Sequence, residues 1–132
     1  MLTGINHITI AVSDVDHSLS FYVDQLGMTA HVKWDRGAYL TLGDAWFCLS
    51  HDDASPAADY SHISLTISEQ DFAAFVDKLR TQNIREWKQN ASEGNSLYIL
   101  DPDGHKLEIH SGSLESRLEA LRKHPYGGLE WL

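Results

Sequence analysis

His7-Ile8-Thr9-Ile10-Ala11-Val12-Ser13-Asp14 has a counterpart later in the chain, His62-Ile63-Ser64-Leu65-Thr66-Ile67-Ser68-Glu69. In both stretches apolar residues alternate with small polar ones, which is typical of a half-buried β-strand. A polar helix-start signal follows each stretch. Because successive side chains of a strand point to opposite faces, the apolar residues are predicted to pack on helices. The two histidines then lie on the other face.

The same succession of elements follows each of these strands. Helices are predicted over residues 15–26 and 70–80, and Gly27 is placed to cap the end of the first. Tight turns at Gly43-Asp44 and at residues 101–104 separate short β-rich runs. These predicted strands cover residues 29–34, 37–42 and 45–49 in the first half and 85–88, 97–100 and 106–110 in the second.

The predicted fold class is α+β, with a βαβββ module that occurs twice in the chain. Module one covers about residues 1–50 and module two about 61–112, joined by a polar stretch over residues 51–60. A C-terminal helix is predicted over residues 113–123, with leucines along one face. A length of 132 residues suits a single domain over residues 1–132.

Composition limits the classes of function. A formal charge of −9 argues against nucleic acid as a partner, and it requires any anionic substrate to be held by a local cationic cluster. No apolar run approaches the roughly 20 residues that span a bilayer, so no membrane partner is expected. Cys48 is the single cysteine, and the first residues lack a secretory pattern, so we expect a cytoplasmic protein.

Three residues are candidate metal ligands. His7 and His62 occupy equivalent positions in the two modules, and Glu108 lies in the last strand between two apolar residues. Two imidazoles and one carboxylate suit a divalent ion such as Mn²⁺, Fe²⁺, Co²⁺ or Zn²⁺. The competing interpretation is ordinary hydrogen-bonded histidines, since the chain has 8 of them. His105 and His110 are set aside because neither shares the symmetry of the repeat.

Residues 87–98 form a connection that is long for a hairpin and rich in polar groups. Asn90, Ser92 and Ser96 offer hard oxygen donors suited to alkali or alkaline-earth cations, and Gly94 permits a sharp turn. The competing interpretation is a solvated polar loop. Lys88 and Arg117 are candidates to hold an anion, and Trp34, Tyr39 and Trp46 are either pocket or core aromatics.

The sequence resembles the fosfomycin-resistance glutathione transferases of the vicinal oxygen chelate superfamily over essentially its whole length. Five segments carry the resemblance: Asn6-His7-Ile8-Thr9, residues 34–49, Ser92-Glu93-Gly94, residues 98–110 with Asp101-Pro102-Asp103-Gly104-His105-Lys106-Leu107-Glu108, and Gly112-Ser113-Leu114 leading to Arg117-Leu118. The resemblance implies paired βαβββ modules in a curved mixed sheet and a domain-exchanged homodimer. It also implies that a thiol, glutathione, is added to the epoxide ring of fosfomycin, which confers antibiotic resistance.

The resemblance further implies a role for each site residue. His7, His62 and Glu108 look like Mn²⁺ ligands, with His7 supplied by the partner subunit, and Thr9, Tyr39, Lys88 and Arg117 look catalytic. The residues that look like the fosfomycin pocket are Thr9, Trp46, Lys88, Ser92, Ser96, Tyr98 and Arg117. Trp34 and Tyr39 look like the thiol side, and a K⁺ loop is implied at Asn90, Ser92, Gly94 and Ser96.

One departure from the family concerns the thiol. Members commonly carry Arg where this chain has Ala91, so a cation that could pair with a glutathione carboxylate is missing. A transferase that uses another thiol is therefore a competing hypothesis. Three further hypotheses stay open: an epoxide hydrolase with Asp44 or Glu93 as general base, a dioxygenase or glyoxalase-like enzyme with the same ligands, and a non-enzymatic drug-binding module.

Overall fold

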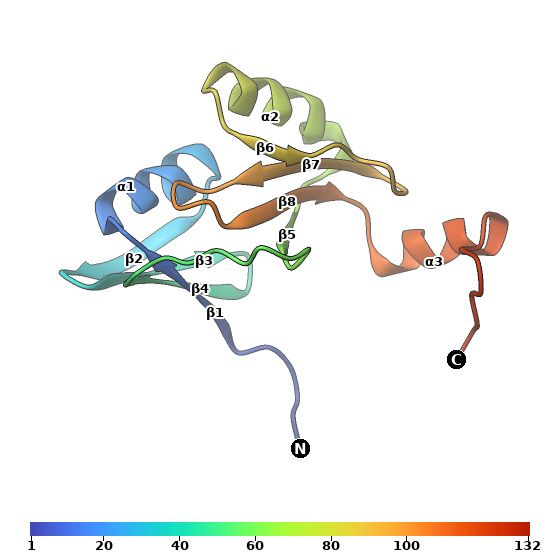
Figure 1. Ribbon diagram of the computed structural model, residues 1–132, viewed down its shortest axis with the longest axis horizontal. Helices are drawn as coiled ribbons and strands as arrows, with labels where there is room; N and C mark the ends of the chain where they lie inside the picture. Colours follow the sequence, from blue (N-terminus) through green and yellow to red (C-terminus); the bar gives the residue numbers. More distant parts are fainter. The chain divides into compact units, whose positions relative to one another are not determined.

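The structure, a computed structural model, describes residues 1–132, and the chain forms two compact units. Unit 1 comprises Met1–Ser61 and Asp101–His105, and unit 2 comprises His62–Leu100 and Lys106–Leu132. Each unit holds one four-stranded mixed sheet with helix beside it (Figure 1). The α+β class and the repeated βαβββ succession predicted from the sequence are confirmed.

Unit 1 has the strand order β1-β4-β3-β2, in which β1 runs parallel to β4 and the other pairs are antiparallel. In β1, Ile10 and Val12 are buried while His7 and Thr9 are exposed, as the alternation predicts. The elements are β1 (His7–Val12), α1 (Val15–Leu19), η1 (Ser20–Gln25), β2 (Thr29–Trp34), β3 (Gly37–Leu42) and β4 (Ala45–His51).

The first helix is not the continuous α-helix predicted over residues 15–26. Asp14 caps α1 by accepting from the His17 backbone N–H at 2.9 Å, but from Ser20 the helix widens into the π-helix η1. The Leu26 N–H donates to the Phe21 carbonyl five residues back. Since a π turn is wider than an α turn, the neighbours Phe21 and Tyr22 are both accommodated in the core of unit 1.

Unit 2 has the strand order β5-β8-β7-β6, with β5 parallel to β8. Its longest helix begins after Ser68, whose hydroxyl accepts from the Asp71 backbone N–H. None of the helices of the chain is both long and apolar enough to cross a membrane. The elements are β5 (Ile63–Thr66), α2 (Glu69–Thr81), β6 (Glu86–Lys88), β7 (Asn95–Leu100), β8 (Lys106–Ser111) and α3 (Leu114–Lys123).

The turn between β7 and β8 belongs to unit 1, where it is held by buried polar contacts. Asp101 is 1 % exposed and accepts from the Tyr22 hydroxyl at 2.8 Å and from the His105 backbone N–H at 2.8 Å. His105 Nε2 also lies 2.7 Å from the Ala11 carbonyl oxygen. These bonds tie the turn to η1 and β1.

Tyr22→Phe should lower the free energy of unfolding by about 1–3 kcal/mol, because it removes the hydroxyl that donates to the buried Asp101 carboxylate. Burial and the Asp101 carboxylate raise the pKa of Tyr22 well above its ordinary value, so the folded state keeps the phenol proton that the unfolded state loses. The stabilisation is therefore complete below pH of about 10 and declines above it. Urea titrations of both proteins from pH 7 to 11 measure the difference between their free energies of unfolding, which should narrow at high pH. A difference that stays constant with pH would contradict a raised pKa of Tyr22.

Candidate active site

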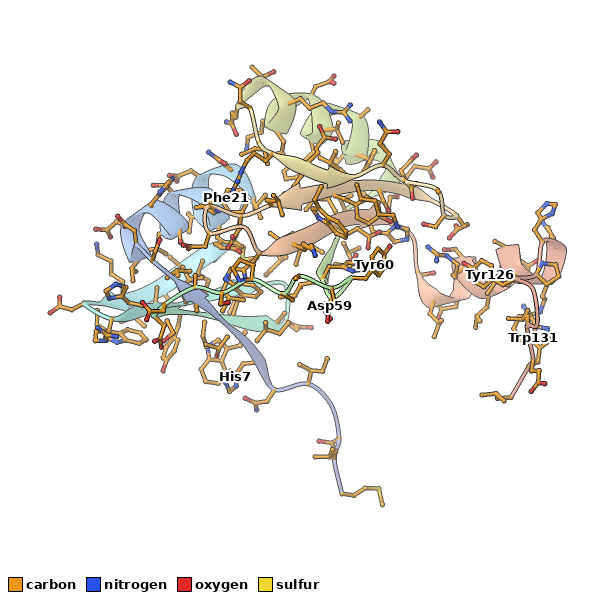
Figure 2. The ribbon with its side chains drawn as sticks, viewed as in Figure 1. His7, Phe21, Asp59, Tyr60, Tyr126 and Trp131 are labelled. Atoms are coloured by element: carbon orange, nitrogen blue, oxygen red, sulfur yellow. The ribbon has the colours of Figure 1, made fainter.

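The open face of the unit 1 sheet carries a row of aromatic rings. His7, at the start of β1, pairs with Trp46 on β4, and their ring centroids lie 4.5 Å apart. Tyr39 contacts Trp46 at 5.3 Å and Trp34 at 4.8 Å. Trp34, Tyr39 and Trp46 are 36–45 % exposed, so they are not core residues of this unit. Figure 2 shows His7 on the side of the sheet away from Phe21.

Thr9 belongs to the same face as this row. It pairs with Cys48 on β4, and Cys48 pairs with Tyr39 on β3, so the three side chains point to one side of the sheet. Thr9 is exposed whereas Cys48 is 5 % exposed and free. Thr9 therefore lies on the same surface of unit 1 as Trp34 and Tyr39, the residues predicted for the thiol side.

In unit 2, the candidate ligands His62 and Glu108 lie against each other. His62 Nε2 lies 3.0 Å from Glu108 Oε2, and Glu108 Oε1 accepts from the Ser96 hydroxyl at 2.6 Å. The Glu108 side chain is 10 % exposed and that of His62 is 21 % exposed. A divalent ion can be bound by an imidazole nitrogen and a carboxylate oxygen that lie this close together.

The charge of Glu108 is stabilised by its neighbours. Burial acts to raise the pKa of this carboxyl, but the hydrogen bonds from Ser96 and His62 and the nearby His110 ring outweigh burial. The pKa of Glu108 therefore lies below its ordinary value. A carboxylate that is ionised near neutral pH binds metal without first losing a proton.

A lysine and an aromatic cluster flank this pair. Trp87 contacts His62 at 5.6 Å and Tyr98 at 5.2 Å between ring centroids. The Lys88 ammonium lies 4.8 Å from the centroid of Tyr98, within the range of a cation–π contact. A cavity of about 670 Å³ opens beside β6 and is lined in part by Lys88 and Ser96.

In the predicted K⁺ loop, the Asn90 side chain forms hydrogen bonds to the backbone on the other side of the loop. The Asn90 amide donates to the Gly94 carbonyl at 2.8 Å and to the Ser92 carbonyl at 3.4 Å. Its Oδ1 accepts from the Ser92 backbone N–H at 3.1 Å and from the Ser92 hydroxyl at 3.0 Å. Two backbone carbonyl oxygens thus converge on one point of the loop.

Arg117 of α3 reaches the same loop. Its guanidinium donates to Glu93 Oε2 at 3.2 Å, to the Glu93 carbonyl at 3.2 Å and to the Ser92 hydroxyl at 3.4 Å. Tyr126, which Figure 2 shows beside α3, accepts from Arg117 at 3.5 Å. Because Glu93 is held by Arg117, it is a poor candidate for the general base of a hydrolase.

The predicted site residues fall into two sets. In unit 2, His62 contacts Glu108, Lys88 lies over Tyr98, and Arg117 contacts Ser92 and Glu93, while His7 belongs to unit 1. No group of three or more His, Cys, Asp or Glu side chains is arranged to hold a metal within this single chain. The set in unit 1 is His7, Thr9, Trp34, Tyr39 and Trp46, and the set in unit 2 is His62, Lys88, Asn90, Ser92, Gly94, Ser96, Tyr98, Glu108 and Arg117.

Two residues next to the candidate ligands are not among those that the sequence singles out. His110 Nδ1 lies 2.6 Å from Ser96 Oγ and 3.5 Å from Glu108 Oε1. Its signal was present, since residues 108 and 110 share a strand face. Trp87 donates from Nε1 to the Leu107 carbonyl at 3.0 Å, a contact that no sequence pattern indicates.

Comparison with known proteins identifies the class. Residues 4–109 match the family model described as the Glyoxalase/Bleomycin resistance protein/Dioxygenase superfamily, and the chain belongs to this superfamily.

Named relatives then narrow the class. The chain is 49 % identical over 134 residues to glutathione transferase FosA of Serratia marcescens, covering 98 % of this chain and 95 % of the relative. It is 41 % identical to metallothiol transferase FosB of Staphylococcus haemolyticus, covering 93 % and 94 %. The fosfomycin resistance protein FosX of Listeria monocytogenes, crystallised with Mn(II) and sulfate, superposes with a TM-score of 0.81 at 25 % identity, covering 94 % and 100 %. The family predicted from the sequence is confirmed.

Proposed function

We propose that this protein inactivates fosfomycin by adding the thiol of glutathione to its epoxide, as a metal-dependent transferase. The observation that carries the proposal is the His62–Glu108 donor pair with Lys88 beside it. In a strongly acidic chain, a lysine over Tyr98 in the aromatic cluster that contacts His62 is suited to attract a small anion such as a phosphonate. The 49 % identity to glutathione transferase FosA supports the same reaction.

The metal is proposed to be Mn²⁺, held by His62, Glu108 and the partner subunit's His7 in a homodimer of the cytoplasm. The open, exposed position of His7 on its own sheet face is consistent with donation to a second copy. A bound divalent ion supplies Lewis acidity toward the oxygens of the substrate. The similar FosX protein was crystallised with Mn(II), which supports this choice of metal.

The residues of the chain position the substrates. Lys88 and Arg117 bind the phosphonate. Thr9 of the partner subunit, which is on the same face of β1 as the partner's His7, donates a hydrogen bond to the oxirane oxygen, where negative charge grows as the ring opens. The thiolate attacks the carbon that bears the phosphonate, a C–S bond forms, the C–O bond breaks, and the released oxygen takes up a proton. Trp34 of the partner subunit and Tyr39 of the partner subunit form the thiol side. Tyr98 and Trp46 of the partner subunit form walls of the pocket.

A potassium ion is proposed in the loop over residues 90–94, with Ser96 beside it. The Ser92 and Gly94 carbonyl oxygens converge on the Asn90 amide N–H, which supports this proposal. K⁺ is bound by carbonyl oxygens, so the ion could take the place that the amide N–H has between them. An added positive charge here would lie near Arg117, which contacts the same loop.

A thiol-consumption assay tests the function. Purified protein is incubated with fosfomycin, Mn²⁺ and K⁺, and with glutathione, cysteine or bacillithiol in parallel. We expect fosfomycin-dependent loss of free thiol and an adduct of matching mass, with none in protein stripped by a chelator. Turnover of fosfomycin without any thiol would instead indicate a hydrolase, and no turnover with bound drug would indicate a binding module.

Ala91→Arg is expected to lower the KM for glutathione by about two- to fivefold, because it places a cation on the exposed loop for a glutathione carboxylate. The effect should fade with added salt and leave the KM for fosfomycin unchanged. Ala91→Gln, which adds length without charge, is the matched control. An equal effect from Ala91→Gln would contradict the charge argument.

A further inference from the structure

One hydroxyl lies between two potential partners at very short range. Ser96 Oγ on β7 is 2.6 Å from Glu108 Oε1 and 2.6 Å from His110 Nδ1, both on β8. A serine hydroxyl has one hydrogen to donate, and an ionised carboxylate can only accept. The hydrogen of Ser96 therefore goes to Glu108, and the short contact with His110 requires Nδ1–H to donate to Ser96 Oγ.

The ring of His110 is confined by two glycines. A Cβ atom at Gly112 would lie 2.6 Å from His110 Nε2, and one at Gly94 would lie 3.0 Å from His110 Cε1 and 2.7 Å from the Ser111 carbonyl oxygen. Atoms do not approach so closely, so any side chain at either position would displace the ring. The backbone at these two positions comes close enough to fix the orientation of the imidazole.

The arrangement assigns different partners to the two oxygens of Glu108. Oε1 is engaged by Ser96, while Oε2 is the oxygen that lies 3.0 Å from His62 Nε2. Hydrogen bonds to the distal atoms of a ligand orient it and tune its affinity for metal. Gly94 also belongs to the loop closed by Asn90, so the same ring connects that loop with the carboxylate.

We propose that His110 is a positioning residue, which donates from Nδ1 to Ser96 so that Ser96 donates to Glu108 and fixes that carboxylate for the metal. The inference rests on the proposed function, because it takes His62 and Glu108 as the metal donors. It also changes the role implied for Ser96: its hydroxyl hydrogen is committed to Glu108 and is not available to the phosphonate.

The tautomer of the His110 ring in the wild-type protein tests the proposal. Long-range ¹H–¹⁵N spectra of the histidine rings at pH 8 separate Nδ1–H from Nε2–H, with His110→Asn used only to assign the signal. We expect His110 to be the Nδ1–H form in the metal-free protein and in the diamagnetic Zn²⁺-loaded protein. An Nε2–H tautomer would overturn the proposal, because Ser96 would then have to donate to His110 and could not donate to Glu108.

Metal affinity tests the path through Ser96. Mn²⁺ binding is measured by electron paramagnetic resonance of free Mn²⁺ in titrations of wild type, Ser96→Ala, His110→Leu and the double variant. Each single change should weaken binding by about 10- to 100-fold. The double variant should be no weaker than the worse single variant by more than about twofold, since the two residues act in series. Multiplying effects would show independent roles and overturn the proposal.

A conservative replacement of His110 shows whether the residue positions Ser96 or only fills space. His110→Asn places an amide N–H near the position of Nδ1 and should recover most of the affinity that His110→Leu loses, while His124→Leu, at the end of α3, should change nothing. If His110→Leu does not fold, as circular dichroism would reveal, the tautomer and His110→Asn still decide the matter. Wild type that binds no Mn²⁺ would contradict the proposed metal function, whereas wild-type binding with unaffected variants would contradict only the role of His110.

Discussion

Glu108→Ala should reduce fosfomycin-dependent thiol consumption by at least about 10³-fold, because it removes one of the two proposed metal ligands that are in contact in unit 2. His62→Ala should have a comparable effect, and the two changes together should be little worse than either one, since each alone disables the same ion. The measurement is kcat/KM for fosfomycin at saturating thiol, with the manganese content of each dialysed protein determined by elemental analysis.

Glu86→Ala is the matched control for this prediction. Glu86 is also a glutamate on a strand of unit 2, but it pairs with Arg80 at 3.0 Å and lies outside the donor pair. Its loss should leave activity and manganese content close to wild type, because ion pairs at exposed positions contribute little. Full activity in Glu108→Ala or His62→Ala, with the fold intact, would remove the metal from the mechanism.

Lys88→Met is expected to lower kcat/KM for fosfomycin by about 10²-fold. The change keeps most of the aliphatic stem over Tyr98 and removes the charge, and a hydrogen bond to a charged group contributes about 1.5–3 kcal/mol. The loss should appear with every thiol tested, since the proposed partner of Lys88 is the phosphonate. Steady-state kinetics over a range of fosfomycin concentrations measure it.

Lys106→Met provides a comparison within the same aromatic cluster. The Lys106 ammonium lies 5.5 Å from the centroid of Trp87, so it is also a lysine over an aromatic ring of unit 2. Removing its charge should alter kcat/KM by less than about threefold, because a cation–π contact contributes little and Lys106 has no proposed contact with the phosphonate. Equal losses in the two variants would mean that general electrostatics, and not a specific contact of Lys88, attracts the drug.

The sequence predicts the elements of this fold well because alternation and turn residues are local signals. β2 and β3 have the predicted bounds, and the other helices and strands after η1 begin and end within two residues of the prediction. The first helix is the exception. Its change to a π-helix depends on the burial of Phe21 and Tyr22 and on the distant Asp101, and neither is visible in the pattern of residues 15–26.

The candidate site was predictable where it follows the repeat. The equivalence of His7 and His62 in the repeat selects His62 as a candidate ligand, and the structure places it against the candidate Glu108. The contacts of Ser96 and Arg117 were not predictable, because they depend on strand register and on the path of the loop over residues 90–94. His110 was discarded for lacking a counterpart in the first module, yet period-two alternation from Glu108 was sufficient to mark it.

The assignment of Asp101–His105 to unit 1 has a consequence for how this chain can be divided. The polypeptide passes between the units at Ser61/His62, at Leu100/Asp101 and again at His105/Lys106. A split gene that ends after the first βαβββ repeat would therefore encode a fragment whose Tyr22 hydroxyl has no acceptor. The first repeat therefore depends for its buried polar contacts on a turn that the second repeat supplies.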